Sequence, residues 1–274
     1  MDFDLAMPLT LSLVTLVSLF LNQKTEGKLK GVLEEREFRV WDAVLLVGMM
    51  AVMITLIVFV RQISLVLMAL FLFSYSVLLF TFGYLFSKNR WYVGIAGPAV
   101  FILLYVFLRD TAIWTFYLAN IYGLVFAVLI TLYIATMFTW QTTAVFGALI
   151  TIMDIVLVLI TKTMVEAANA AVRLSLPVLV SVPLIPLVMT ERGLLLMNLG
   201  LGDFFFSGLL AIQTFKKYGK RLAILSIIAM ATSFFIFEAL ILNYGVKAFP
   251  GTLMIICGWI PLVVIKNLKK MFSS

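Results

Sequence analysis

Residues 200–203 read Gly200-Leu201-Gly202-Asp203 and lie inside an apolar run that extends from Leu194 to Phe215. An ionisable group near the middle of a bilayer costs roughly 2.5–3.5 kcal/mol on insertion scales, so an aspartate there needs a reason. The two glycines remove side-chain bulk beside it, which suits close helix packing and also lets another backbone approach the carboxylate. The stretch therefore predicts a membrane-embedded acid with space next to it.

The composition indicates a membrane protein with many spans. Of its 274 residues, 64% are hydrophobic, whereas soluble domains have roughly 45–50% apolar residues. The formal net charge of +7 fits basic cytoplasmic loops that face anionic lipid, and we expect no nucleic acid partner. The chain has no histidine, which excludes a zinc protease of the H-E-x-x-H kind and a Ser–His intramembrane protease. We expect no metal and no cofactor.

Apolar segments of about 20 residues predict membrane-spanning helices. Nine such segments cover residues 4–22, 42–60, 63–86, 91–108, 112–137, 140–162, 194–215, 220–242 and 248–268. The expected fold is an all-α bundle of nine transmembrane helices in a single domain, 1–274. Residues 1–138 would form a scaffold of five spans, and residues 139–274 would hold the site. The first loop, 23–41, is either a short surface helix or a solvated linker.

The connection at residues 163–193 is unusually long. Its first half, to residue 174, predicts a helix. Its second half, 175–190, is apolar but contains Pro177, Pro183 and Pro186, which oppose an uninterrupted helix. We expect this half to be partly extended, at the outer membrane face or in a groove.

The basic residues predict an orientation, because lysine and arginine are enriched in cytoplasmic loops. With the N-terminus outside, the inside segments hold Lys24, Lys28, Lys30, Arg36, Arg39, Lys88, Arg90, Lys216, Lys217, Lys220, Arg221, Lys266, Lys269 and Lys270. The outside segments hold only Arg61, Arg109, Lys162, Arg173, Arg192 and Lys247. We therefore expect a multi-pass protein of the cell membrane with its N-terminus outside and its C-terminus in the cytoplasm.

Three acids lie well inside the predicted spans, namely Asp154, Asp203 and Glu238. A rise of 1.5 Å per residue places Asp154 roughly 12 Å and Asp203 roughly 13–14 Å below the outer helix ends. Glu238 would lie about 6 Å deep and is less demanding to explain. Two carboxylates at one depth can share a proton, because like charges a few ångströms apart do not both ionise cheaply. One could then activate water while the other polarises a carbonyl and protonates a leaving nitrogen.

The same acids allow other interpretations. Either carboxylate could simply pair with a threonine, a lysine or a backbone group in a packed bundle. Both could instead form the proton or cation site of a transporter or channel. Depth and composition do not decide between a protease and a transporter, and a non-catalytic scaffold protein is a third interpretation.

Gly200-Leu201-Gly202-Asp203 resembles the G-x-G-D motif of the presenilin and signal-peptide-peptidase family of intramembrane aspartyl proteases. The motif lies in the seventh predicted span and Asp154 lies in the sixth, as in that family. Residues 204–210 resemble the family's seventh span, and Leu176-Pro177-Val178-Leu179 resembles its archaeal members. The resemblance covers the second half of the chain, and the first five spans only by number. It implies an aspartic endopeptidase with Asp154 and Asp203 as its catalytic pair, and it favours the protease.

The chain departs from the family pattern at two places. The family usually has tyrosine before its first aspartate, where this chain has Met153, which cannot donate a hydrogen bond. The family's Pro-Ala-Leu stretch corresponds to Pro250-Gly251-Thr252-Leu253, although Pro250 would equally suit a plain helix start. The resemblance assigns these four residues, with Gly200, Leu201 and Gly202, to motif and substrate-binding positions. The expected partners are membrane lipid and transmembrane segments of type II proteins or signal-peptide remnants.

Overall fold

The computed structural model describes residues 3–32, 37–59, 64–87, 90–190, 193–246 and 248–271. Within these ranges, eight helices are long and apolar enough to cross a membrane. The protein is therefore a mainly helical, multi-pass membrane protein. Five basic residues used to predict its orientation lie outside the described residues: Arg36, Arg61, Lys88, Arg192 and Lys247.

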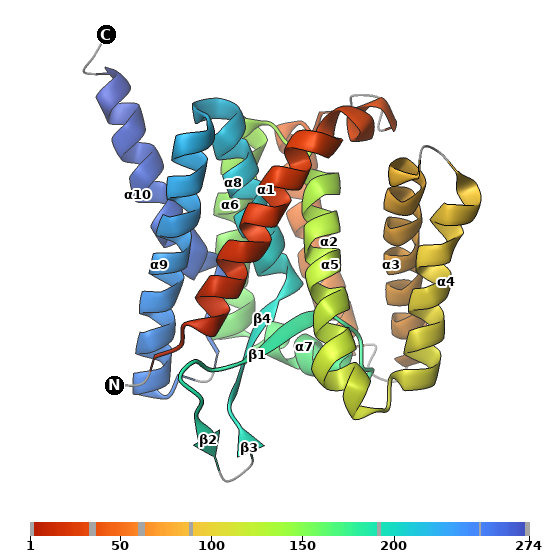
Figure 1. Cartoon of the computed structure of the whole chain (residues 1–274). Helices are drawn as coiled ribbons and strands as arrows, with labels where there is room; N and C mark the ends of the chain where they lie inside the picture. Colours follow the sequence, from red (N-terminus) through yellow and green to blue (C-terminus); the bar gives the residue numbers. More distant parts are fainter. Residues whose placement is uncertain are drawn as a thin grey trace.

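The elements follow one another as α1 (Ala6–Val32), α2 (Val40–Phe59), α3 (Ser64–Phe86), α4 (Trp91–Leu108), η1 (Trp114–Leu118), α5 (Ala119–Ala135), α6 (Trp140–Ile155), η2 (Val156–Ile160), α7 (Thr163–Arg173), β1 (Leu179–Pro183), β2 (Met189–Thr190), β3 (Gly193–Leu194), β4 (Leu196–Gly200), α8 (Leu201–Tyr218), α9 (Lys220–Tyr244) and α10 (Gly251–Met271). The two η segments are single π-helical stretches that continue into or out of a longer helix. The two termini lie at opposite ends of the bundle (Figure 1).

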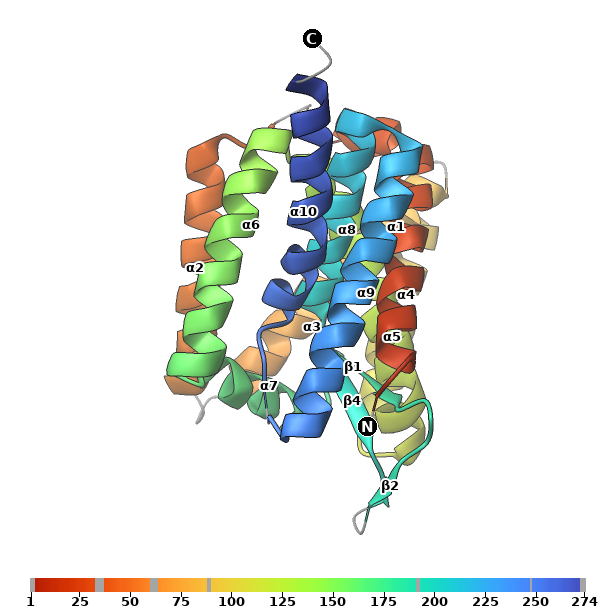
Figure 2. The same cartoon turned by 90° about the vertical axis from the view of Figure 1, so that its left-hand side faces the viewer.

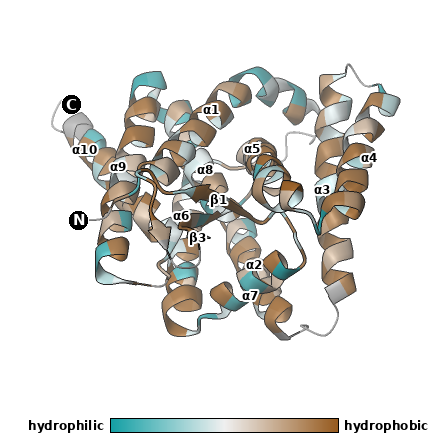
Figure 3. Cartoon of the chain, turned by 60° about the horizontal axis from the view of Figure 1, so that its bottom comes forward, coloured by the Kyte–Doolittle hydropathy of each residue, from teal (hydrophilic) through white to brown (hydrophobic). Residues whose placement is uncertain are grey.

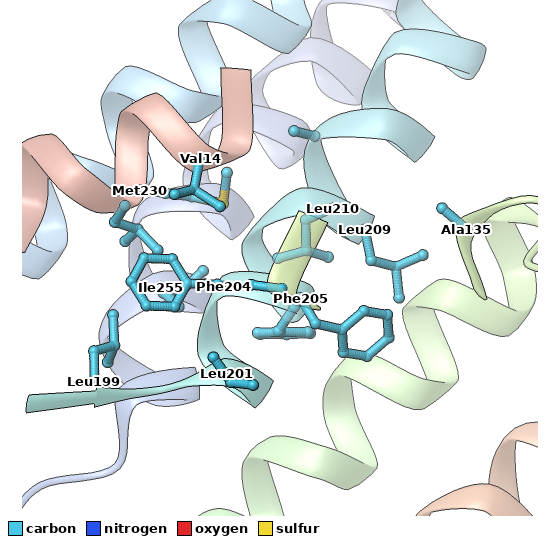
Figure 4. Packing of buried hydrophobic residues seen from close by; sticks show 14 of the residues in the cluster. Val14, Ala135, Leu199, Leu201, Phe204, Phe205, Leu209, Leu210, Met230 and Ile255 are labelled. Carbon is cyan, nitrogen blue, oxygen red and sulfur yellow. The ribbon is translucent and has the colours of Figure 1, made fainter. Parts of the chain in front are cut away.

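Helix α8 lies at the centre of the bundle, in contact with α1, α5, α6, α9 and α10 (Figures 1 and 2). Every residue from Phe204 to Thr214 is buried, and Figure 4 shows Phe204 and Leu210 packed among side chains of the surrounding helices. Helix α8 also carries Asp203, Lys216 and Lys217, and it is not one of the eight apolar helices. Because protein rather than lipid surrounds it, its own hydropathy says little about its depth. The ninth predicted span stays a prediction.

The seventh predicted span, residues 194–215, is wrong at its start. Residues 196–200 form the strand β4, and the helix begins only at Leu201. Strand β4 pairs antiparallel with β1, so that Leu179 lies opposite Gly200 and Pro183 lies opposite Leu196. The short strands β2 and β3 form a second pair beyond them. Hydrophobicity did not reveal β4 because its partner lies far away in the sequence and a short apolar run suits either structure. The predicted extended character of residues 175–190 is confirmed at β1 and β2.

Helix α1 continues to Val32 and so replaces most of the predicted first loop. Neither a separate surface helix nor a linker begins at residue 23. Glu26 fixes this charged end of α1 to α8. Its carboxylate pairs with Lys30 one turn later (3.2 Å) and with Lys216 of α8 (2.9 Å). The extension therefore packs onto the same end of the bundle as the α8–α9 turn. Figure 3 shows hydrophilic residues at this end of α1 and on α7, while hydrophobic residues dominate the other helices.

Three aromatic side chains tie the segment between α7 and β1 to the helical bundle. Each donates a hydrogen bond to a backbone carbonyl of that segment: Tyr75 to Pro177 (3.2 Å), Tyr105 to Leu174 (2.7 Å) and Trp114 to Ser175 (2.7 Å). These rings belong to α3, α4 and η1, and they pack with Phe101 and Phe126 in one aromatic cluster. The bundle thus fixes the extended segment that leads to the ribbon of β1 and β4.

Candidate active site

The two predicted catalytic aspartates come from α6 and α8. Asp154 is the second-to-last residue of α6, which ends just before the π-helical stretch η2. Asp203 is the third residue of α8, immediately after β4. Asp203 therefore lies in the first turn of its helix and not nine residues inside it, as the sequence had predicted. The start of α10 lies beside both acids.

Thr252 holds Asp154 by two hydrogen bonds. Its Oγ1 donates to Oδ2 of Asp154 at 2.6 Å, and its backbone N–H donates to the same oxygen at 3.2 Å. The N–H is available because the first N–H groups of a helix have no partner within the helix. Asp154 is only 7% exposed, so the two bonds fix the orientation of a buried carboxylate. A leucine at this position, as in the Pro-Ala-Leu stretch that the segment resembles, could not make the hydroxyl bond.

Gly251 leaves room for Asp203. A Cβ atom at position 251 would lie 2.5 Å from Oδ1 and 2.6 Å from Cγ of Asp203, closer than real Cβ contacts. Gly251 and Thr252 are neighbours in the chain, and consecutive Cα atoms are 3.8 Å apart. Asp203 therefore meets the first of these residues and Asp154 the second. The structure brings the predicted pair together at the start of α10.

The remaining predicted positions divide into those near the acids and those further away. A Cβ at Gly200 would lie 3.3 Å from Oδ2 of Asp203, whereas a Cβ at Gly202 would meet nothing within 4 Å. Close packing therefore does not require the second glycine. The Pro250 carbonyl accepts the N–H of Met254 (3.3 Å) at the start of α10. Leu253 is partly buried and packs against the core.

An apolar cavity of about 350 Å³ adjoins the motif. Its wall includes residues 200–202 together with side chains from α2, α3, α5 and α7 and the start of β1. Met53, Phe71 and Ala168 are typical of this lining, and Ser74 and Tyr75 are its polar side chains. The sequence did not predict this cavity, because its walls come from helices that are distant along the chain.

The outer edge of β4 is open. The Leu201 N–H donates to the Val178 carbonyl (3.2 Å), which sets the alternation of paired and unpaired residues along the ribbon. By that alternation, the backbone groups of Leu196 and Asn198 point away from β1. In the part of the chain that the structure describes, no hydrogen bond reaches these outward groups. Strand β4 ends at Gly200, which is also the first residue of the motif.

The sequence analysis gave too little weight to one residue and did not single out another. Glu238 of α9 is fully buried, and both of its carboxylate oxygens lack a hydrogen-bond partner among the described residues, so it is more demanding to explain than its predicted depth indicated. Asn120 of α5 pairs with both backbone groups of Ser181 in β1. The signal available for Asn120 was a single amide in an apolar helix, which needs a polar partner.

The described residues contain no group of three or more histidine, cysteine, aspartate or glutamate side chains placed to hold a metal ion. The candidate site consists of Asp154, Asp203, Gly251 and Thr252, with the cavity and the open edge of β4 beside them. No protein-family model matches the chain, and no curated protein matches it.

Proposed function

We propose that this protein is an intramembrane aspartyl endopeptidase related to the presenilin and signal-peptide-peptidase family. One observation carries the proposal: Asp154 and Asp203, from two helices, meet at the Gly251–Thr252 start of a third helix. A carboxylate pair of this kind performs hydrolysis without histidine or metal. The sequence motif around Asp203 and the arrangement of its neighbours agree on the same chemistry.

In the proposed reaction, one carboxylate removes a proton from water while the water oxygen attacks the peptide carbonyl carbon. The partner carboxyl donates a hydrogen bond to the carbonyl oxygen and later protonates the leaving nitrogen. The C–N bond breaks, and the products are a new carboxyl terminus and a new amine. Thr252 would keep Asp154 oriented during these steps, and Gly251 would keep the space that Asp203 occupies.

The substrate would bind as an extended strand on the outer edge of β4. A transmembrane helix hides its carbonyls in internal hydrogen bonds, so it must unwind before its peptide bonds can react. The outward groups of Leu196 and Asn198 offer replacement hydrogen bonds to the unwound backbone, in the manner of strand addition. The apolar cavity beside Gly200 would take a hydrophobic side chain of that strand. Residues 1–138 would then contribute cavity walls as well as a scaffold.

The proposed topology has nine spans, with α8 as the protein-enclosed ninth member of the bundle. The N-terminus would lie outside and the C-terminus in the cytoplasm, because the basic residues of the α1 end, the α8–α9 turn and α10 would then face the cytoplasm. This orientation suits type II membrane proteins or signal-peptide remnants as substrates.

The alternative function is a proton-coupled transporter or channel that uses the same acids. The apolar lining of the cavity favours the protease, because an ion or a polar solute would need polar groups along its path. The cavity instead offers a surface for the side chains of a transmembrane segment.

The deciding experiment uses the purified full-length protein in detergent with a panel of transmembrane peptides, and mass spectrometry of the products. We expect wild type to cut, Asp154→Asn and Asp203→Asn each to abolish cutting, and Glu238→Gln to cut like wild type. A wild-type protein that cuts no peptide, but takes up solute into acid-loaded vesicles, would establish the transporter instead.

The strand-addition step has its own test in Asn198→Pro. Proline removes an N–H that points away from β1, so the ribbon keeps its internal hydrogen bonds while the open edge loses a donor. We expect kcat/KM to fall roughly tenfold relative to the matched variant Asn198→Ala. Equal activity of the two variants would contradict pairing on this edge.

A further inference from the structure

The outer edge of β1 is obstructed, unlike that of β4, and both outward backbone groups of Ser181 are bonded. Pro183 has no N–H to offer. At Ser181, the Asn120 Oδ1 accepts the backbone N–H (2.7 Å) and the Asn120 Nδ2 donates to the carbonyl (2.9 Å). At Leu179, the carbonyl lies 3.5 Å from the position of a Cβ at Gly123 in α5. The ribbon therefore has one open edge and one closed edge.

The closure comes from one face of α5. Asn120 and Gly123 are three residues apart and so lie on the same side of the helix. A Cβ at Gly123 would lie 3.3 Å from Cγ2 of Val180, so the glycine lets α5 approach β1 closely enough for the amide to reach Ser181. A carboxamide has one acceptor and one donor group, which match the two backbone groups of a single strand residue. Asn120 thus takes the place that a neighbouring strand would occupy.

We propose that Asn120 is a positioning residue that anchors the ribbon to α5 and so sets which peptide bond of the substrate reaches Asp203. This inference rests on the proposed function. Because β1 is fixed by Asn120 and is paired residue by residue with β4, the anchor also fixes the open edge of β4 relative to Asp203. A substrate strand on that edge takes its register from this fixed frame. The closed edge of β1 excludes a second, unproductive pairing.

The test uses the full-length protein carrying Asn120→Leu, Ser181→Pro or both, with Asn120→Asp as a second variant that keeps the acceptor for the Ser181 N–H. Thr232→Val is the control, because it also removes a polar side-chain group from a helix and Thr232 donates to the Ile228 carbonyl within α9 (2.9 Å). Two quantities are measured. The first is amide hydrogen exchange over residues 178–200 without substrate. The second is the set of cleavage positions in a transmembrane peptide, with kcat and KM.

We expect Asn120→Leu to speed exchange in β1 and β4 roughly tenfold and to spread cleavage over neighbouring peptide bonds. Asn120→Asp should do so less, and Thr232→Val not at all. Ser181→Pro removes one of the two bonds, so Asn120→Leu should have a smaller additional effect in that background than in wild type. A merely structural role would lower kcat for all products equally and leave their positions unchanged.

Two results would overturn the inference. The first is an Asn120→Leu protein that exchanges faster but yields wild-type cleavage positions. The second is a rate of amide hydrogen exchange over residues 178–200 that is the same in wild type and in both Asn120 variants. This second result needs no cleavage, so it would overturn the inference even if wild type cuts no peptide. Wild-type inactivity on the whole panel contradicts the proposed function itself, so the two failures are distinguishable.

Discussion

Two pairs of acidic residues lie inside this bundle, and they are built differently. Asp154 and Asp203 meet at the start of α10, where Thr252 donates to one and Gly251 makes room for the other. The second pair is Asp4, just before α1, and Glu238 of α9, which are both fully buried where α1 packs against α9. Beside that pair the structure has neither a side-chain donor to Glu238, within the described ranges, nor the cavity that adjoins the motif.

Asp4 has an ordinary structural task. Its Oδ1 accepts the N–H groups of Ala6 (2.9 Å) and Ile185 (2.8 Å), and its Oδ2 accepts that of Met7 (3.0 Å). The residue therefore caps the N-terminus of α1 and ties it to the segment after β1. A buried acid alone is thus a weak sign of catalysis. The difference between the pairs lies in the donors from Thr252, the clearance at Gly251 and the apolar cavity lined by the neighbouring residues 200–202.

The largest difference between the two pairs should appear in the cleavage rate when one acid of each pair is neutralised. Asp154→Asn or Asp203→Asn should lower the proposed cleavage rate roughly 10²- to 10⁴-fold, because a positioned acid or base contributes that much. Glu238→Gln should leave the rate unchanged. The measurement is the initial rate on a transmembrane peptide, with circular dichroism to verify folding. A Glu238→Gln protein as inactive as Asp203→Asn would remove the distinction between the two pairs.

The second prediction concerns the space at Gly251. Gly251→Ala would place a Cβ against Oδ1 and Cγ of Asp203 and should displace that carboxylate. A misplacement of about 1 Å can lower a rate roughly 100-fold, so we expect a loss of that size in kcat. Gly48→Ala in α2 is the matched control, because a Cβ there meets nothing within 4 Å. Equal loss in both variants would show that α-helix propensity or general packing, and not Asp203, causes the effect.

The third prediction isolates the Thr252 hydroxyl. Thr252→Val keeps the shape of the side chain and the backbone N–H bond but removes the 2.6 Å hydrogen bond to Asp154. A hydrogen bond to a charged group contributes about 1.5 kcal/mol or more, so we expect kcat to fall about tenfold. Thr252→Ser retains a hydroxyl and should recover most of the rate. If valine and serine variants behave alike, the hydroxyl does not orient Asp154.

The sequence predicted which two acids lie close together better than it predicted how the chain places them. Residue types and the G-x-G-D stretch identified Asp154 and Asp203, and hydropathy located eight of the nine predicted spans. Counting depth along two straight helices failed, because β4 occupies what had been assigned to the start of the seventh span. Strand pairing between residues 179–183 and 196–200, and the clearance at Gly251, depend on contacts between distant segments. Neither leaves a local pattern in the sequence.

The smallest expected effects are on stability, and they test the second pair. Glu238→Met replaces a buried carboxyl group that has no hydrogen-bond partner among the described residues by an apolar side chain of similar size. Burying an unpaired polar group costs about 1–3 kcal/mol, so we expect the variant to raise the midpoint of thermal unfolding in detergent. Asp4→Ala should lower that midpoint, because it removes an N-cap worth about 1 kcal/mol.

The double variant Asp4→Ala with Glu238→Met tests whether the two acids of the second pair influence each other. Buried like charges near each other repel, and both acids are buried where α1 packs against α9. Removing Asp4 should therefore reduce the stabilisation that Glu238→Met gives in wild type, and the two effects should not add. Additive effects would mean that Glu238 is destabilising by burial alone. A Glu238→Met variant that unfolds at a lower temperature would instead mean that Glu238 is held by a contact the described residues do not contain. In that event the contrast between the proposed catalytic pair and a structural pair would no longer hold.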